Sequence, residues 1–112
     1  MEESDIDMTI FARDLADGVG TGASADVYTV PVNTTTVVKK WSFNNTTAGA
    51  LLLTVKVNNG AADRELLSAV SIAAKTPYNP VELNGLTINQ GGVVKIDAPA
   101  GITFWLSGIE II

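Results

Sequence analysis

The two side chains that most often act in catalysis or hold transition metals are missing from this chain. Its 112 residues include no cysteine and no histidine, which excludes disulfides and thiolate metal sites and removes the commonest general base. Carboxylates remain, and they could bind calcium or act in pairs on a glycosidic bond. The candidates for calcium are Asp5, Asp7, Asp14, Asp17 and Asp26, and those for an acid pair are Asp63, Glu65 and Glu82.

Neither set of carboxylates has the spacing that its chemistry needs. Asp5-x-Asp7 supplies two ligands of a calcium loop without the rest of it, and the other acids are spread along the chain. A solvated acidic arm explains the N-terminal acids better. Nothing in the spacing of Asp63, Glu65 and Glu82 holds two of them across a cleft. We therefore predict a protein that is not an enzyme and that binds no metal or cofactor.

A glycine-rich run over residues 18–24 contains Gly18, Gly20 and Gly22. It lacks the Lys-Ser/Thr ending of a P-loop and the spacing of a dinucleotide site, and no helical pattern follows it. We predict a flexible loop over residues 16–24 instead. The net charge of −5, from 12 acids and 7 bases, argues against nucleic acid as a partner, because phosphate binding needs a basic excess.

Aromatic side chains could stack on sugar rings, and the candidates are Trp41, Trp105, Tyr28 and Tyr78. Trp41 shares the alternation of Phe43, which predicts a place in the core. Trp105 lies between Thr103 and Ser107, on the face opposite the neighbouring apolar residues. An outward tryptophan is costly to leave in water, so Trp105 is the best candidate for an anchor. Contact with another protein subunit is favoured over a sugar.

The surface of this chain would be unusually poor in charge. Hydrophobic residues make up 46% and charged residues 17%, whereas an ordinary soluble domain has about 25% charged residues. Such a surface predicts that other protein covers part of it. The longest strictly apolar runs, such as residues 50–53, fall far below the ~18 residues of a membrane span. The acidic start differs from a secretory signal, so we expect a protein retained in the cytosol of its producing cell.

Short segments of alternating apolar and polar residues predict strands, most clearly at Leu51–Asn58. Pro31 confines the strand before it to an edge or an end of a sheet. Near the C-terminus Ile102, Phe104 and Leu106 share one face. At Gly108 the alternation changes phase, and Ile109 and Ile111 would then face the core. A glycine at such a change is typical of a β-bulge.

Three further segments are harder to interpret. Residues 63–75 fit either a helix capped by Asp63 or a strand with Leu66, Val70 and Ile72 facing inward. We predict a strand, because the neighbouring segments are strands.

Around residue 40, Val37, Trp41 and Phe43 predict one inward face, although Lys39 falls on that face too. Residues 81–88 predict a tight hairpin, with Asn84-Gly85 as its type I′ turn.

About eight short strands separated by turn residues predict an all-β fold. We expect one domain, an antiparallel β-sandwich of the jelly-roll or immunoglobulin-like kind, over residues 16–112. Residues 1–15 would form an N-terminal arm or a first strand. Ile10 and Phe11 could reach a neighbouring molecule and add a strand to its sheet, or this segment could be a frayed tail.

The order of these segments resembles a pattern in small virion proteins of tailed bacteriophages. A Tyr-Thr-x-Pro strand start leads to a Thr-Val-Val-Lys strand, an Asn-Thr turn and later strands over most of residues 27–112. The matching segments are residues 27–31, 33–39, 43–46, 53–57, 66–67, 71–74, 86–92 and 106–111. This chain has Gly91-Gly92 where the family usually has Gly-Asp, a difference that affects turn geometry.

The resemblance implies a structural role without an active site. It predicts a non-enzymatic, decoration-type component attached to the capsid or tail lattice of a phage, made in the bacterial cytoplasm and located in the virion. The expected partners are major capsid or tail proteins and copies of itself, in a trimer or larger ring. Nucleic acid and membrane are not expected. The expected interface residues are Trp105, Tyr78, Ile10 and Phe11.

An alternative function is a receptor- or carbohydrate-binding module at the tip of the tail. In that case Trp105 and Tyr78 would be the residues that stack on sugar rings.

Overall fold

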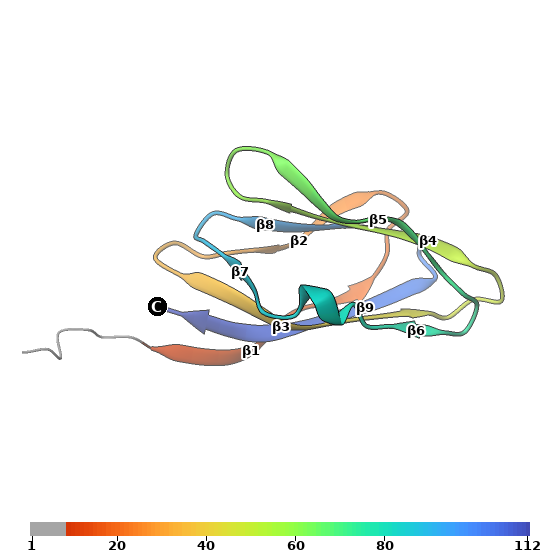
Figure 1. Cartoon of the computed structure of the whole chain (residues 1–112), viewed down its shortest axis with the longest axis horizontal. Coiled ribbons are helices and arrows are strands. Elements are labelled where there is room, and N and C mark those ends of the chain that lie inside the picture. Colours follow the sequence, from red (N-terminus) through yellow and green to blue (C-terminus); the bar gives the residue numbers. More distant parts are fainter. Residues whose placement is uncertain (1–8) are drawn as a thin grey trace, which may run out of the picture.

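The computed structural model describes residues 9–112 and shows two antiparallel sheets packed face to face (Figure 1). The first sheet has the strand order β1 (Ile10–Val19), β9 (Ile102–Ile111), β3 (Thr35–Asn45) and β6 (Pro77–Tyr78), and β7 (Leu86–Ile88) also pairs with β3. The second sheet has the order β2 (Ser24–Thr29), β8 (Val93–Asp97), β4 (Leu51–Asn58) and β5 (Asp63–Ile72). The predicted antiparallel β-sandwich is confirmed.

The core lies between the two sheets. Every second side chain of β4, β8 and β9 points into it, as the alternation predicted for Leu51–Asn58. Trp41 is also a core residue as predicted: it is 1% exposed, and its Nε1–H donates to the Leu83 carbonyl at 3.0 Å. Strand β2 ends before Pro31 and lies at the edge of the second sheet, which confirms the constraint predicted from the proline.

Residues 63–72 form a strand, β5, as predicted, and Val70 and Ile72 lie against the core as expected, but Leu67 takes the buried position that was expected for Leu66. Leu67 and Ile72 are buried, whereas Leu66 is only half-buried. A bulge explains the difference, because Ala69 has a φ of +49° and its N–H donates to the hydroxyl of Thr54. A second extra residue, Leu66, lies between Glu65 and Leu67 in the pairing with β4, and each extra residue changes the alternation of the strand.

The predicted inward face of β3 was wrong in its first half. Val38 is fully buried, whereas Val37 is half-buried on the outer face. In the pairing with β9, Val38 lies opposite Gly108 and Lys40 lies opposite Ser107, so Lys39 is an extra residue. This bulge is the reason why Lys39 did not fit the alternation.

The phase change predicted at Gly108 was also wrong. Strand β9 keeps one alternation to its end, so Gly108 and Glu110 face inward, while Ile109 and Ile111 face outward. The bulges lie in the two neighbouring strands instead: in β3 between the partners of Gly108 and Ser107, and in β1 between the partners of Ser107 and Leu106. Gly108 is required for close approach, because a Cβ there would lie 2.1 Å from the carbonyl oxygen of Val37.

The predicted hairpin at residues 81–88 does not form. Residues Val81–Leu83 make a short 3₁₀ helix, and Leu86–Ile88 pairs with β3. Asn84 has φ −64° and ψ 134°, and Gly85 has φ +88°. These are type II angles, whereas a type I′ turn needs a positive φ at both central residues.

The predicted loop over residues 16–24 is shorter than expected. Strand β1 continues to Val19, and β2 begins at Ser24. The intervening loop is held by backbone hydrogen bonds, from Gly20 N–H to the Ile102 carbonyl and from Gly22 N–H to the Ala98 carbonyl.

The expected N-terminal arm falls partly outside the described residues, and so do Asp5 and Asp7, the candidate calcium ligands. From Ile10 onward the chain forms β1, which pairs with β9 of the same molecule. Strand β1 therefore runs across residue 15, where the arm and the domain were expected to meet. The division of the chain into residues 1–15 and 16–112 stays a prediction.

Candidate functional site

The outer face of the first sheet carries the exposed tryptophan. Trp105 is 52% exposed, and its outward position agrees with the sequence prediction. Across the sheet it lies opposite Asp17 of β1 and Ser42 of β3. Paired residues on adjacent antiparallel strands share a face, so these polar side chains flank the indole.

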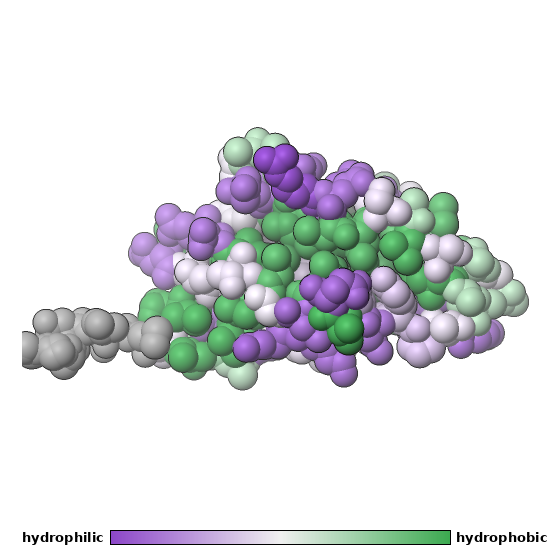
Figure 2. Space-filling view, viewed as in Figure 1, coloured by the Kyte–Doolittle hydropathy of each residue, from purple (hydrophilic) through white to green (hydrophobic). Residues whose placement is uncertain are grey.

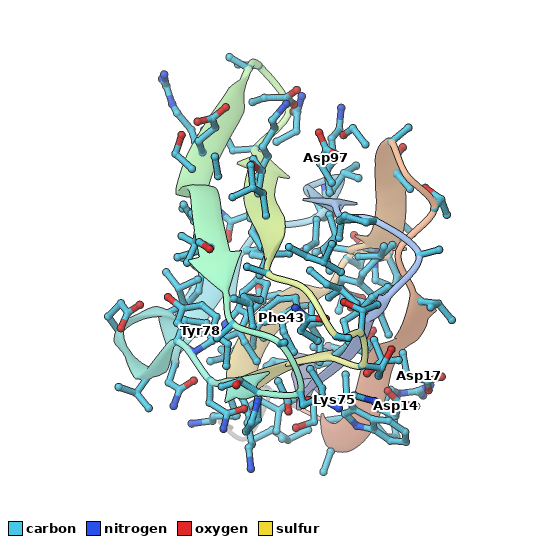
Figure 3. All side chains as sticks on the ribbon, turned by 90° about the vertical axis from the view of Figure 1, so that its right-hand side faces the viewer. Asp14, Asp17, Phe43, Lys75, Tyr78 and Asp97 are labelled. Atoms are coloured by element: carbon cyan, nitrogen blue, oxygen red, sulfur yellow. The ribbon has the colours of Figure 1, made fainter. Side chains whose placement is uncertain are left out.

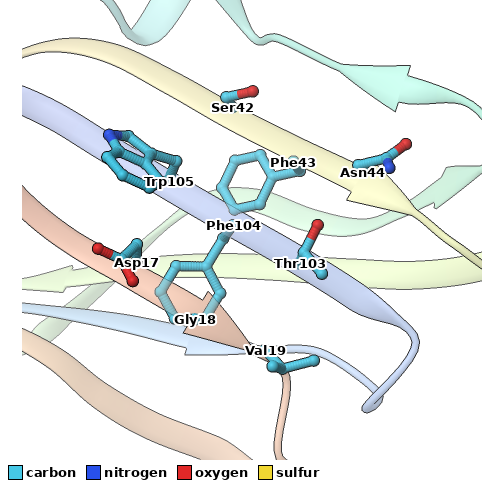
Figure 4. A pocket seen from close by; sticks show the side chains of 9 residues that line it. All are labelled: Asp17, Gly18, Val19, Ser42, Phe43, Asn44, Thr103, Phe104 and Trp105. Atoms are coloured by element: carbon cyan, nitrogen blue, oxygen red, sulfur yellow. The ribbon is translucent and has the colours of Figure 1, made fainter.

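A groove of about 300 Å³ lies beside this indole (Figure 4). Three consecutive residues from each of three adjacent strands line it: residues 17–19 of β1, 42–44 of β3 and 103–105 of β9. In each group of three, the side chains of the first and third residues face the groove, because strand residues alternate between faces. The middle residues are Gly18, Phe43 and Phe104, and their backbones form the floor.

Hydrogen-bonding groups surround the groove. They are the carboxylate of Asp17, the hydroxyls of Ser42 and Thr103, and the amide of Asn44. Within residues 9–112, the side-chain hydrogen bonds involve none of Ser42, Asn44 and Thr103. Among the described residues, therefore, none competes with a ligand for these three side chains.

A second carboxyl group lies next to the groove. Asp14 and Asp17 are three residues apart, so a regular strand would place them on opposite faces. The extra residue Leu15 puts both on the outer face, opposite Ser107 and Trp105 respectively. Figure 3 shows the two side chains together. The hydrogen bond between the two carboxyl groups raises the pKa of Asp14, and desolvation and the charge of Asp17 add to the shift.

The other end of the same face is apolar. Ile10 lies opposite Ile111, and Ile109 lies opposite both Ala12 and Val37. Ile10 is 53% exposed, and Ile109 and Ile111 are half-buried. We call these five residues the apolar end. In Figure 2, apolar residues gather at this end of the molecule, where β1 begins and β9 ends.

The predicted interface residues do not form one surface. Phe11 lies opposite Glu110, so its side chain is on the other face of β1 from that of its neighbour Ile10. The Phe11 ring lies 5.3 Å from the Arg13 guanidinium. Tyr78 lies opposite Phe43, half-buried against the core. Trp105 and Tyr78 therefore lie on opposite faces of the first sheet and cannot stack on the same sugar ring.

A buried polar cluster joins the two sheets, and the sequence analysis missed it. Glu110 is 7% exposed, receives a hydrogen bond from Tyr28 at 2.5 Å and forms an ion pair with Arg13 Nε at 2.9 Å. The Thr36 hydroxyl lies 2.7 Å from the Tyr28 oxygen. Burial and the hydrogen bond to Glu110 raise the pKa of Tyr28 to about 12. The unbroken alternation of β9 was the available signal, since it places Glu110 inward.

Of the carboxylates considered for an acid pair, Asp63 and Glu65 both lie on β5, and each has a polar side chain as its partner. Asp63 contacts Asn58 at 2.9 Å and Lys95 at 3.3 Å, which lower its pKa. Glu65 accepts a hydrogen bond from Ser68, and Glu82 lies in the 3₁₀ helix. In the part of the chain that the structure describes, no group of three or more acidic side chains is placed to hold a metal ion.

No protein-family model matches the chain, and no curated protein matches it. Two matching crystal structures show a pentameric capsid protein isolated from metagenomic phage sequences. They have TM-scores of 0.41 and 0.40, 15% identity and coverage of 87% of this chain. The match spans 60% and 61% of their lengths, and TM-scores this low do not establish a common fold.

Among residues 9–112, no helix is long and apolar enough to cross a membrane.

Proposed function

We propose that this protein is a non-enzymatic structural component of a tailed-phage virion, attached to the capsid or tail lattice in the manner of a decoration protein. The observation that carries the proposal is the apolar end of the first sheet. The strand and turn patterns shared with small virion proteins and the β-sandwich fold support it. The protein would be made in the bacterial cytoplasm and would act in the virion.

The apolar end has the properties of a docking surface. Ile10, Ile109 and Ile111 are contiguous across two strands, and the second sheet lies on the opposite side of these strands. Covering such a surface stabilises a complex by about 25 cal/mol for each Å² of apolar area removed from water. Contiguous exposed apolar patches on soluble domains often mark interaction sites.

Strand β1 adds a second means of attachment. It is the outermost strand of the first sheet, and no strand within residues 9–112 pairs with its outer edge, so in our proposal this edge pairs with a strand of another molecule. Ile10 and Phe11 lie at the start of this edge and face opposite sides. In our proposal both contact a capsid or tail protein, or another copy of this chain in a symmetric ring, and Tyr78 makes a separate contact.

The test is co-sedimentation of the purified protein with particles of the phage that encodes it, after the particles have been stripped of this protein. We expect Ile10→Asp to reduce binding at least tenfold. Leu52→Asp is the matched control, because Leu52 is exposed on the second sheet. Failure of the unchanged protein to sediment with the particles, or equal binding by both variants, would contradict the proposal.

A receptor- or carbohydrate-binding module at the tail tip is the second candidate. The exposed indole of Trp105, beside a groove that also carries polar side chains, favours it. The protein would then adhere to host cells, and Trp105→Ala would abolish that adhesion without affecting attachment to the particle.

A further inference from the structure

We infer that the groove beside Trp105 is a binding site for one pyranose ring of a neutral saccharide. The inference narrows the ligand class of the second candidate function, and it does not depend on attachment through the apolar end. The two surfaces lie apart on β1, since Ile10 is seven residues from Asp17 along the strand.

The shape of the groove suits a pyranose ring. One face of such a ring is a flat array of C–H groups, and its edge carries hydroxyl groups. Trp105 offers a half-exposed aromatic surface, and the exposed Val19 adds a second apolar contact. The polar groups of Asp17, Ser42 and Asn44 stand around these two. An apolar lining with a few convergent polar groups is typical of small-molecule sites.

The hydrogen-bonding groups also match a saccharide. A sugar hydroxyl both donates and accepts, so it needs partners of both kinds. The Asp17 carboxylate only accepts, while the Asn44 amide and the hydroxyls of Ser42 and Thr103 donate and accept. A hydroxyl donating to Asp17 would form a charge-assisted hydrogen bond, which is about twice as strong as a neutral one. A protein partner docking on Trp105 would have to satisfy the same groups.

Charge selects a neutral ligand over an acidic one. Asp14 and Asp17 lie together on this face, and their proximity already disfavours ionisation of Asp14. Lys40, which lies opposite Ser107, contributes one positive charge, so the three groups together are net negative when both acids are ionised. A uronic or sialic acid would therefore bind more weakly than a neutral hexose.

The size of the groove limits the ligand and its affinity. Its volume of about 300 Å³ is at the lower end of ligand pockets. It accommodates one ring, or one ring and part of the next in a chain. We expect a Kd on the order of 1 mM for a free disaccharide. Useful binding to a cell surface would then require many copies on one particle.

The experiment is a titration of the full chain with maltose, lactose, cellobiose and chitobiose as probes, in which NMR spectra are recorded at each probe concentration. The chain has two tryptophans, and their indole N–H signals provide an internal control. Trp105 is exposed in the groove, whereas Trp41 is buried and bonded to Leu83. We expect at least one probe to shift the Trp105 signal in a saturable manner and to leave the Trp41 signal unchanged.

Substitutions test whether the saccharide binds in the groove beside Trp105. Trp105→Ala and Asp17→Asn should each weaken binding at least fivefold, and Asp26→Asn, a change at an exposed acid of β2, should have no effect. The thermal midpoint of Trp105→Ala should stay close to that of the unchanged protein, because its side chain is half-exposed. A sialylated lactose should bind more weakly than lactose.

Two results would overturn the inference: no probe shifts the Trp105 signal, or binding is unchanged in Trp105→Ala. If no saccharide binds and Trp105→Ala reduces co-sedimentation with the particles, the groove contacts a protein, and the structural role in the virion stands. If a saccharide binds and Ile10→Asp sediments normally, the saccharide site stands and the docking surface at the apolar end is wrong.

Discussion

The two faces of β9 have similar apolar content and opposite environments. On the inner face Ile102, Phe104 and Leu106 are buried beneath the second sheet. On the outer face, no other described segment covers Trp105, and Ile109 and Ile111 are only half-buried. Hydrophobicity alone therefore does not identify the core, since the position of the second sheet decides which apolar residues stabilise the fold. The outer ones are available for binding.

The difference between the two faces of β9 can be tested by introducing a charged side chain on each face. Leu106→Asp would bury a carboxylate with no partner, at a cost of several kcal/mol, comparable with a total stability of about 5–15 kcal/mol. We expect this variant not to fold, as measured by circular dichroism and thermal unfolding. Trp105→Asp, one residue earlier and on the outer face, should fold normally. A cooperative unfolding transition in Leu106→Asp would contradict the assignment of the faces.

Disruption of the buried polar cluster around Glu110 should cause the next largest loss of folding stability. Glu110→Ala removes the acceptor for Tyr28 and the partner of Arg13. The half-buried Tyr28 hydroxyl then keeps only Thr36, whereas the exposed Arg13 can bond to water. We expect a loss of about 1.5–3 kcal/mol in urea unfolding, which is the usual worth of a hydrogen bond to a charged group. The control Asp26→Ala should change stability by less than about 0.5 kcal/mol. A loss of less than about 1 kcal/mol for Glu110→Ala would show that the cluster adds little to stability.

Close packing between β9 and β3 gives a smaller expected effect. In Gly108→Ala the new methyl group would meet the Val37 carbonyl oxygen and the Cα of Val38, so β3 must move. We expect a loss of about 1–3 kcal/mol, as for other overpacked sites. Gly49→Ala is the control, because a Cβ there meets no atom within 4 Å. Equal stability of the two variants would mean that β3 moves without cost.

The change in folding stability at alkaline pH should be the smallest of these effects. The pKa of Tyr28 is raised to about 12 from its ordinary value of 10, so the folded state holds this proton more tightly than the unfolded chain. Its contribution to stability is complete below pH 10 and is lost as the pH rises towards 12. We expect the free energy of unfolding to fall more steeply over this range in the unchanged protein than in Tyr28→Phe. Equal slopes in the two proteins would contradict the raised pKa.

Much of the architecture could be predicted from the sequence. Period-two alternation and turn residues identified most strands, including Leu51–Asn58 and the ambiguous segment that became β5. Pro31 correctly indicated an edge strand, because proline cannot donate to a sheet. The contrast between Trp41 and Trp105 was also correct, since each followed the alternation of its nearest neighbours in the chain.

Tertiary structure decided the phase of the strands and the site that depends on it. Leu15, Lys39 and Ala69 are extra residues whose positions are set by the strand paired beside them. Each bulge moves the following side chains to the other face of the sheet. Asp14 therefore joins Asp17 beside Trp105, and the same pairing leaves Glu110 inside with Tyr28. Local alternation specifies that a segment is a strand, but only its partner strands determine which face each residue occupies.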